Sequence, residues 1–269
     1  LFKNLFMNDY KRFSNIRTLS EPYPILIIDN FMTEEEAKEG YDIITSSKSD
    51  EYVNGGRFNI RKGTNEFKKF ISKNKVFENL YNFFNDESQF DFLYTKLQNT
   101  MKNSENKYQA TNLPTNFNKT YFVYKRNIHQ NKFFKKILNY FWIKTPDIIK
   151  KNLRLIYTCN YFDINFSYAK KGYKLITHRD KDTRVIVFLL YLNDLKTEDG
   201  GALEVYSKNN DNDFELKDKF TPKTGKLIAF LSNPDSYHNV SEIVNADITR
   251  CFCYGSYSSN QDIVWKKID

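Results

Sequence analysis

Residues 184–192 read RVIVFLLYL, an almost continuous apolar run that is rich in valine and isoleucine. A run of this kind at strand length is typical of a β-strand that is buried on both faces. Further segments of strand length, with turn residues between them, lie on either side of it. They are 152–168 (as two strands), 202–206, 226–231, 237–244 and 249–257. Many short strands separated by turns indicate a double-sheet jelly roll, also called a double-stranded β-helix.

The first half of the chain has a different pattern. Residues 21–31, EPYPILIIDNF, predict a buried strand, and Thr33 followed by Glu36 forms a capping-box pattern at the start of a helix. Apolar residues at helical spacing predict more helices at 77–84, 90–101 and 133–143, whereas 50–65 predicts a loop or hairpin, 102–116 a loop and 120–124 a short strand. We therefore expect an α+β chain, mainly β, whose N-terminal helices support a jelly-roll core.

The length of 269 residues suits a single domain with a sizeable core. We find no internal repeat, low-complexity tract or linker. We therefore expect one domain over 1–269, with a mainly helical part at 1–150 and the jelly-roll core at 151–260.

Composition and charge argue against several classes of partner. The net charge is +8, but basic residues are scattered and interleaved with acids, so a nucleic-acid partner is not favoured. No apolar run approaches the roughly 20 residues that cross a bilayer, and residues 1–19 lack the apolar core of a signal peptide. Three cysteines do not suggest a disulfide framework. We expect a cytoplasmic protein without a membrane partner, and nothing indicates an oligomeric state.

Two of the three histidines lie in the β-rich half and suggest a metal site. His178 and Asp180 are two residues apart, so in an extended chain they point to the same side and can bind one cation together. His238 could supply a third ligand. Two histidines and one carboxylate form the facial triad of non-haem Fe(II) oxygenases. The alternative is that His178 bonds to Asp180 at a strand end and His238 is an ordinary half-buried imidazole.

Arg250 is a charged residue in the largely apolar segment 248–254. If its side chain points inward it needs a partner, and a guanidinium binds a carboxylate in bidentate fashion. The distal carboxylate of 2-oxoglutarate would suit it. The alternative is an outward-facing arginine on an edge strand.

An ordered set of motifs resembles the prolyl 4-hydroxylase-like branch of the 2-oxoglutarate/Fe(II) oxygenases. The set is Tyr168, Gly172, His178-Arg179-Asp180, YLND, DGGALEVY, GKLIAF, His238-Asn239-Val240 and Arg250, with PYPILIIDNFMTEEEA near the start. The resemblance implies that His178, Asp180 and His238 bind Fe(II) and act in catalysis. It also implies that Arg250 and Tyr168 bind 2-oxoglutarate, and that O2 and ascorbate are further cofactors. Phe252 stands where many relatives have serine, and Asp180 favours hydroxylation over halogenation.

The substrate is less well defined by the sequence. The resemblance favours a prolyl residue of a protein or peptide, and a free amino acid or other small metabolite is the alternative. The loops 50–65, 101–118 and 209–216 are candidates for specificity, and Arg57 and Arg61 could bind a substrate carboxylate or simply be solvated. Alternatives of another class are a non-catalytic jelly-roll binding module and a zinc hydrolase. His129 is expected to be a surface histidine.

Overall fold

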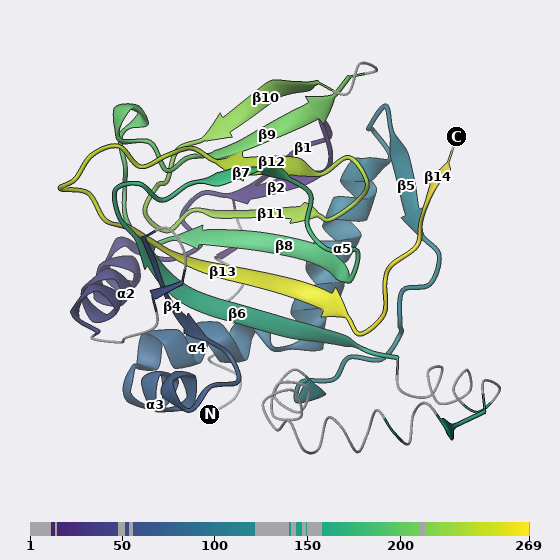
Figure 1. Ribbon diagram of the computed structural model, residues 1–269, viewed down its shortest axis with the longest axis horizontal. Coiled ribbons are helices and arrows are strands. Elements are labelled where there is room, and N and C mark those ends of the chain that lie inside the picture. Colours follow the sequence, from purple (N-terminus) through teal and green to yellow (C-terminus); the bar gives the residue numbers. More distant parts are fainter. Residues whose placement is uncertain are drawn as a thin grey trace.

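The computed structural model describes residues 12–13, 15–47, 52–53, 56–121, 140, 144–146, 149, 158–209 and 213–268. Within these residues, two larger antiparallel sheets, a two-stranded sheet and a set of helices form a layered molecule (Figure 1). His129, all of the predicted helix 133–143 except residue 140, and most of the predicted strand 120–124 lie outside the described residues.

The larger sheet combines strands from both halves of the chain. In the described residues its order is β1-β2-β11-β8-β13-β6-β4-β3. The strands are β1 (Ile16–Leu19), β2 (Ile25–Ile28), β3 (Tyr52–Val53), β4 (Arg57–Arg61), β6 (Asn160–Ala169), β8 (Arg184–Tyr191), β11 (Leu227–Leu231) and β13 (Arg250–Ser259). The apolar run at 184–192 forms β8, which is buried along almost its whole length between β11 and β13.

The smaller sheet has the order β10-β9-β12-β7 and covers one face of the larger one (Figure 1). Its strands are β7 (Leu175–His178), β9 (Leu203–Lys208), β10 (Phe214–Phe220) and β12 (Tyr237–Val240). A buried cluster fills the space between the sheets, with Ile25 and Ile27 from β2, Val187 and Leu189 from β8, and Val205 from β9 among its members. Two facing sheets around an apolar interior constitute the jelly roll, so the predicted fold class is confirmed.

Helices cover the opposite face of the larger sheet. They are α2 (Glu34–Ser46), α3 (Asn65–Lys73), α4 (Lys75–Phe84) and α5 (Glu87–Met101). The capping box at α2 is present, with Thr33 accepting from the backbone of Glu36 and the Glu36 side chain accepting from the Thr33 backbone. None of the helices in the described part of the chain has the length and apolarity that crossing a membrane requires.

Several elements differ from the sequence-based expectation. Of the region predicted as two strands at 152–168, residues 152–157 lie outside the described residues, and the rest contains β6. The predicted loop at 102–116 contains β5 (Lys107–Ala110), which pairs with β14 (Trp265–Ile268), and the predicted loop at 209–216 overlaps β10. These strands are polar and partly exposed, so their sequences carry no apolar signal, and they form because a partner strand lies beside them.

A candidate metal centre with an arginine-lined cavity

His178 and His238 face each other across two neighbouring strands. They form a directly opposed pair in the ladder between β7 and β12, and their ring centroids lie 4.5 Å apart. His238 is buried on β12, whereas His178 is partly exposed at the end of β7. Strand pairing thus brings two imidazoles together that are far apart in the sequence.

Both imidazoles use the same ring nitrogen for a backbone contact. Nδ1 of His178 lies 2.8 Å from the carbonyl oxygen of Ile176, and Nδ1 of His238 lies 3.0 Å from that of Ser236. A carbonyl can only accept, so each ring carries its proton on Nδ1 and keeps the lone pair of Nε2 available for a metal. Burial lowers the pKa of His238, which favours the neutral ring that binds metals.

Asp180 completes the group from the turn that follows β7. Its Oδ1 accepts an ion-pair hydrogen bond from Arg184, the first residue of β8. Its Oδ2 is buried, has no hydrogen-bond partner among the described residues, and lies 3.6 Å from Nε2 of His238. One ligand atom from each of His178, Asp180 and His238 fits within 4.8 Å, which suits a single metal ion. A buried carboxylate oxygen without a donor is expensive unless a cation binds it, so these residues fit a metal.

Arg250 is completely buried at the start of β13. Its guanidinium carbon lies 4.1 Å from the centre of the Phe252 ring and 5.2 Å from that of Tyr191. None of its three guanidinium nitrogens has a hydrogen-bond partner among the described residues. Such a group is stable only with an anion beside it, and a planar guanidinium matches a carboxylate. The side chain therefore fits the distal carboxylate of 2-oxoglutarate.

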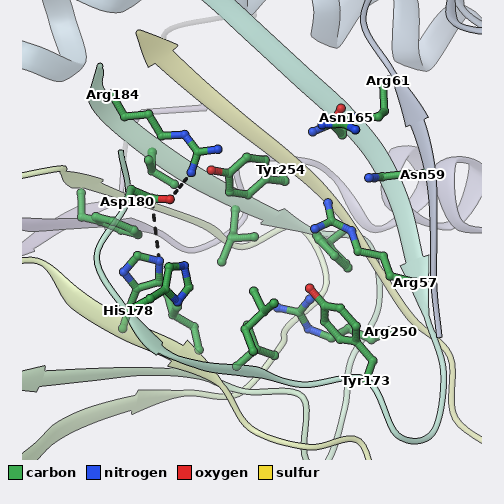
Figure 2. Close-up of a pocket in the computed structure, with 18 residues that line it drawn as sticks. Arg57, Asn59, Arg61, Asn165, Tyr173, His178, Asp180, Arg184, Arg250 and Tyr254 are labelled. Atoms are coloured by element: carbon green, nitrogen blue, oxygen red, sulfur yellow. Dashed lines mark hydrogen bonds and ion pairs between the residues drawn. The ribbon is translucent and has the colours of Figure 1, made fainter. Parts of the chain in front are cut away.

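A cavity of about 280 Å³ connects the metal group with Arg250. This volume is near the lower end of the roughly 300–1,000 Å³ that is usual for small-molecule sites. In Figure 2, His178, Asp180 and Arg184 lie on one side of the cavity, and Arg57, Arg250 and Tyr173 lie on another. The apolar part of the lining comes from the interior between the two sheets, and it includes Val187, Leu189, Leu203, Phe230, Val240 and Phe252.

The register of three strands explains which side chains reach the cavity. Ala169 on β6 is paired with Arg250 on one side and with Arg57 on the other. Two residues along, Ser167 is paired with Phe252 and Asn59 in the same way. Because side chains alternate between the faces of a sheet, both rows point toward the smaller sheet and the cavity.

Tyr168 follows the opposite parity on β6. Its ring stacks on Phe58 at 4.7 Å and packs against the core under the helices, and it is not among the residues that line the cavity. Its expected contact with 2-oxoglutarate therefore finds no support in this placement.

Tyr173, in the turn before β7, lines the cavity instead. Tyr173, Arg184 and Tyr254 were not recognised from the sequence, because their exposure depends on turns and register rather than on a local motif.

Comparisons with known proteins agree with this geometry. Residues 164–255 match the family model of the 2OG-Fe(II) oxygenase superfamily. No curated protein matches the chain. Among solved structures, a prolyl-4-hydroxylase from Pseudomonas putida is 27% identical over 36% of this chain and 50% of that chain, with a TM-score of 0.28. A prolyl 4-hydroxylase from Phytophthora capsici is 12% identical over 88% of this chain and 59% of that chain, with a TM-score of 0.50. The viral collagen prolyl hydroxylase of Paramecium Bursaria Chlorella virus-1 is 12% identical over 88% and 96%, with a TM-score of 0.44.

The chain matches this family model over residues 164–255, which include His178, Asp180, His238 and Arg250. Its jelly roll is the fold of the prolyl 4-hydroxylases, although it spans only 50% and 59% of the first two of those chains. The name of that superfamily refers to Fe(II) and 2-oxoglutarate, and His178, Asp180 and His238 lie close enough together to hold one metal ion.

Proposed function

We propose that this protein hydroxylates an unactivated C–H bond, with Fe(II) held by His178, Asp180 and His238 and 2-oxoglutarate anchored by Arg250. One observation supports the proposal above the others. A buried carboxylate oxygen without a donor and a buried guanidinium without an acceptor line the same cavity. The first requires a cation and the second an anion, and Fe(II) with 2-oxoglutarate supplies both.

The residues of the site position and shield the reaction. Fe(II), 2-oxoglutarate and O2 together supply the oxidation of the C–H bond. His178 and His238 present Nε2 because their Nδ1 atoms bond to the backbone, and Arg184 fixes the orientation of the Asp180 carboxylate. The apolar side chains between the sheets keep water away from the reacting groups.

For the substrate, we propose a prolyl residue of a protein or peptide. The motifs and the fold are those of prolyl 4-hydroxylases, which supports this choice. A free amino acid is a second candidate, because Arg57 and Arg61 also line the cavity and suit a small molecule with a carboxylate.

Anaerobic reconstitution with Fe(II) and 2-oxoglutarate tests the assignment. A bound pair gives a weak metal-to-ligand charge-transfer band in the visible region. We expect this band in the wild-type protein, and we expect Arg250→Ala to weaken 2-oxoglutarate binding by about ten-fold or more, since hydrogen bonds to charged groups contribute about 1.5–3 kcal/mol. Arg17→Ala removes an exposed arginine outside the cavity and serves as the control.

Absence of the band in folded, iron-loaded protein would contradict the oxygenase assignment and favour a non-catalytic binding module. If the band forms, turnover of prolyl peptides and of free proline, measured as succinate release, distinguishes the two candidate substrates.

A further inference from the structure

Arg57 is one of four arginines that line the cavity, together with Arg61, Arg184 and Arg250. It lies on β4, two strands away from Arg250 and on the same face of the sheet, because both residues are paired with Ala169. Its side chain is partly buried, and its Nε is shielded from solvent without a hydrogen-bond partner among the described residues. Arg57 therefore has one guanidinium nitrogen without an acceptor, at a different place in the cavity from Arg250.

The Arg57 side chain is held in position by neutral groups. One terminal nitrogen donates to Oγ of Ser167 at 3.0 Å, and Ser167 in turn donates to Oδ1 of Asn59. The guanidinium carbon lies 4.8 Å from the centre of the Phe252 ring and 5.8 Å from that of Tyr254. These contacts orient the guanidinium but leave its charge uncompensated.

No carboxylate in the described part of the cavity lining is available to Arg57. Asp180 is the one acidic residue among the lining residues, and it is paired with Arg184 at the metal group. The charged and titratable neighbours of Arg57 are Tyr173, Arg250 and Tyr254. Burial lowers the pKa of Arg57, which reflects the cost of holding a cation there without a partner.

Loading the site with its cofactors does not correct this imbalance. Fe(II) brings two positive charges and 2-oxoglutarate two negative ones, so together they add no net charge. The carboxylates of 2-oxoglutarate are occupied at the metal and at Arg250 in the function proposed above. An additional anion is needed for Arg57, and the remaining component of the reaction is the substrate.

We propose that the substrate carries a carboxylate that Arg57 binds inside the cavity, with the exposed Arg61 at the outer end of the same strand attracting it. The inference rests on the proposed hydroxylase function and narrows its substrate class. The carboxylate belongs either to a free amino acid or to a peptide, as its C-terminus or an acidic side chain next to the reactive residue. A neutral peptide with amidated ends is excluded as a good substrate.

Binding of matched pairs to the anaerobic Fe(II)/2-oxoglutarate protein tests the proposal. The pairs are L-proline and L-prolinamide, Gly-Pro as acid and as amide, and the blocked tripeptides Glu-Pro-Gly and Gln-Pro-Gly. Affinity is measured by calorimetry and by the change in the charge-transfer band. We expect the acid of at least one pair to bind about ten-fold tighter than the member that lacks the carboxylate. The pair that shows the difference identifies the source of the carboxylate.

Variants connect the difference to Arg57. In Arg57→Gln, the affinities for the two members of that pair should lie within about two-fold of each other. Arg57→Lys should restore part of the preference, since lysine keeps the positive charge but lacks the planar guanidinium that binds a carboxylate with two hydrogen bonds. Arg17→Gln removes the same charge from the exposed surface and should leave the preference intact. The affinity for 2-oxoglutarate should stay within about three-fold of wild type in Arg57→Gln, which also shows that the variant is folded.

The outcomes separate this inference from the function it rests on. If the charge-transfer band never forms, the hydroxylase assignment fails. If the band forms but the members without the carboxylate bind as well as the acids, or no acid binds, the carboxylate inference is overturned while the assignment stands. If Arg57→Gln weakens 2-oxoglutarate binding as much as Arg250→Ala does, Arg57 is a second anchor for the cosubstrate and the inference is also overturned.

Discussion

Asp180 uses its two carboxylate oxygens for different tasks. Oδ1 accepts from Arg184, and Oδ2 is directed toward the imidazole of His238 (Figure 2). The arginine therefore decides which oxygen faces the metal position. An unrestrained carboxylate would rotate between orientations, and only some of them suit a metal shared with two imidazoles.

Replacing Arg184 should accordingly impair metal binding although it is no ligand. We expect Arg184→Gln to weaken Fe(II) affinity by about 10–100-fold, the usual effect of removing a group that orients a metal ligand. Anaerobic competition with a chromogenic chelator measures this. Arg179→Gln is a matched control, because Arg179 pairs with Asp182 in the same turn and the pair is largely exposed. Equal losses in both variants would argue against an orienting role for Arg184.

Lys62 is a buried cation next to β4 whose protonation should affect stability. Its Nζ donates to the carbonyl of Phe162 at 2.6 Å and to Oδ1 of Asn85 at 3.1 Å, and burial lowers its pKa from 10.5 to about 8. Between these values the unfolded chain binds more protons than the folded one, so this residue makes stability rise with pH.

We expect wild type to gain stability relative to Lys62→Met between pH 8 and pH 10, by at most about 1.4 kcal/mol per pH unit. Urea unfolding of both proteins across this range measures the difference. Lys69→Met, at an exposed lysine on α3, should follow the wild-type profile. A constant difference between wild type and Lys62→Met would show that Lys62 keeps an ordinary pKa in the folded state.

The central strand β13 packs closely against its neighbours in the larger sheet. It pairs with β6 along one edge and with β8 along the other. Gly255 lies in its middle, where an added Cβ would overlap the ring of Phe188. That ring stacks on Phe84 with centroids 4.3 Å apart, so it cannot move aside easily.

Gly255→Ala should therefore destabilise the fold by about 1–3 kcal/mol, the usual cost of overpacking a core. Urea denaturation gives the value. Combining it with Phe188→Leu should make the double variant more stable than the sum of the single effects predicts, by at least about 0.5 kcal/mol. Strict additivity would mean that the two positions do not clash.

The elements that the sequence predicts well are those with their own apolar signal. The strands β2, β8, β11 and β13 and the helices α4 and α5 follow from local patterns. The strands β7 and β10 have exposed, mixed sequences and exist because β12 and β9 pair with them. Local patterns cannot report a pairing with a distant strand, so those elements were not predicted.

The same distinction holds for the candidate site. His178, Asp180, His238 and Arg250 were identified because short motifs surround them. Arg57 and Arg250 reach the same cavity because β6 lies between β4 and β13 in the larger sheet. No local sequence pattern encodes this strand order. The role predicted for Tyr168 stays a prediction, and its side chain lies on the other face of β6 from the cavity because neighbouring residues of a strand point to opposite faces.

Across the whole molecule, the helices cover one face of the larger sheet and the smaller sheet covers the other. The cavity lies between the two sheets. The unpaired groups at Asp180 and Arg250 make the unloaded protein less stable than its fold allows. Ligands that satisfy them should raise the stability of the entire domain.

We expect Fe(II) with 2-oxoglutarate, each at about 100 times its Kd and without oxygen, to add about 2.7 kcal/mol or more. For a protein of this size this corresponds to an increase in Tm of about 5–10 °C. Scanning calorimetry measures it. Arg250→Ala should keep the increase caused by Fe(II) and lose about half or more of the further increase from 2-oxoglutarate, since a ten-fold weaker affinity leaves the ligand at about 10 times its Kd. An unchanged increment would contradict the role of Arg250.

The position of β13 has a consequence for biosynthesis. It is the last strand of the larger sheet to leave the ribosome, yet it occupies the place between β8 and β6. Until it emerges, the nascent chain holds two incomplete sheets with open edges, which are prone to pair with other chains. The strand that joins them begins with Arg250, so the sheet closes and the proposed carboxylate anchor is added in a single step. A chain interrupted before residue 250 would therefore lack both, and a protease or chaperone could distinguish it from the finished protein by those open edges.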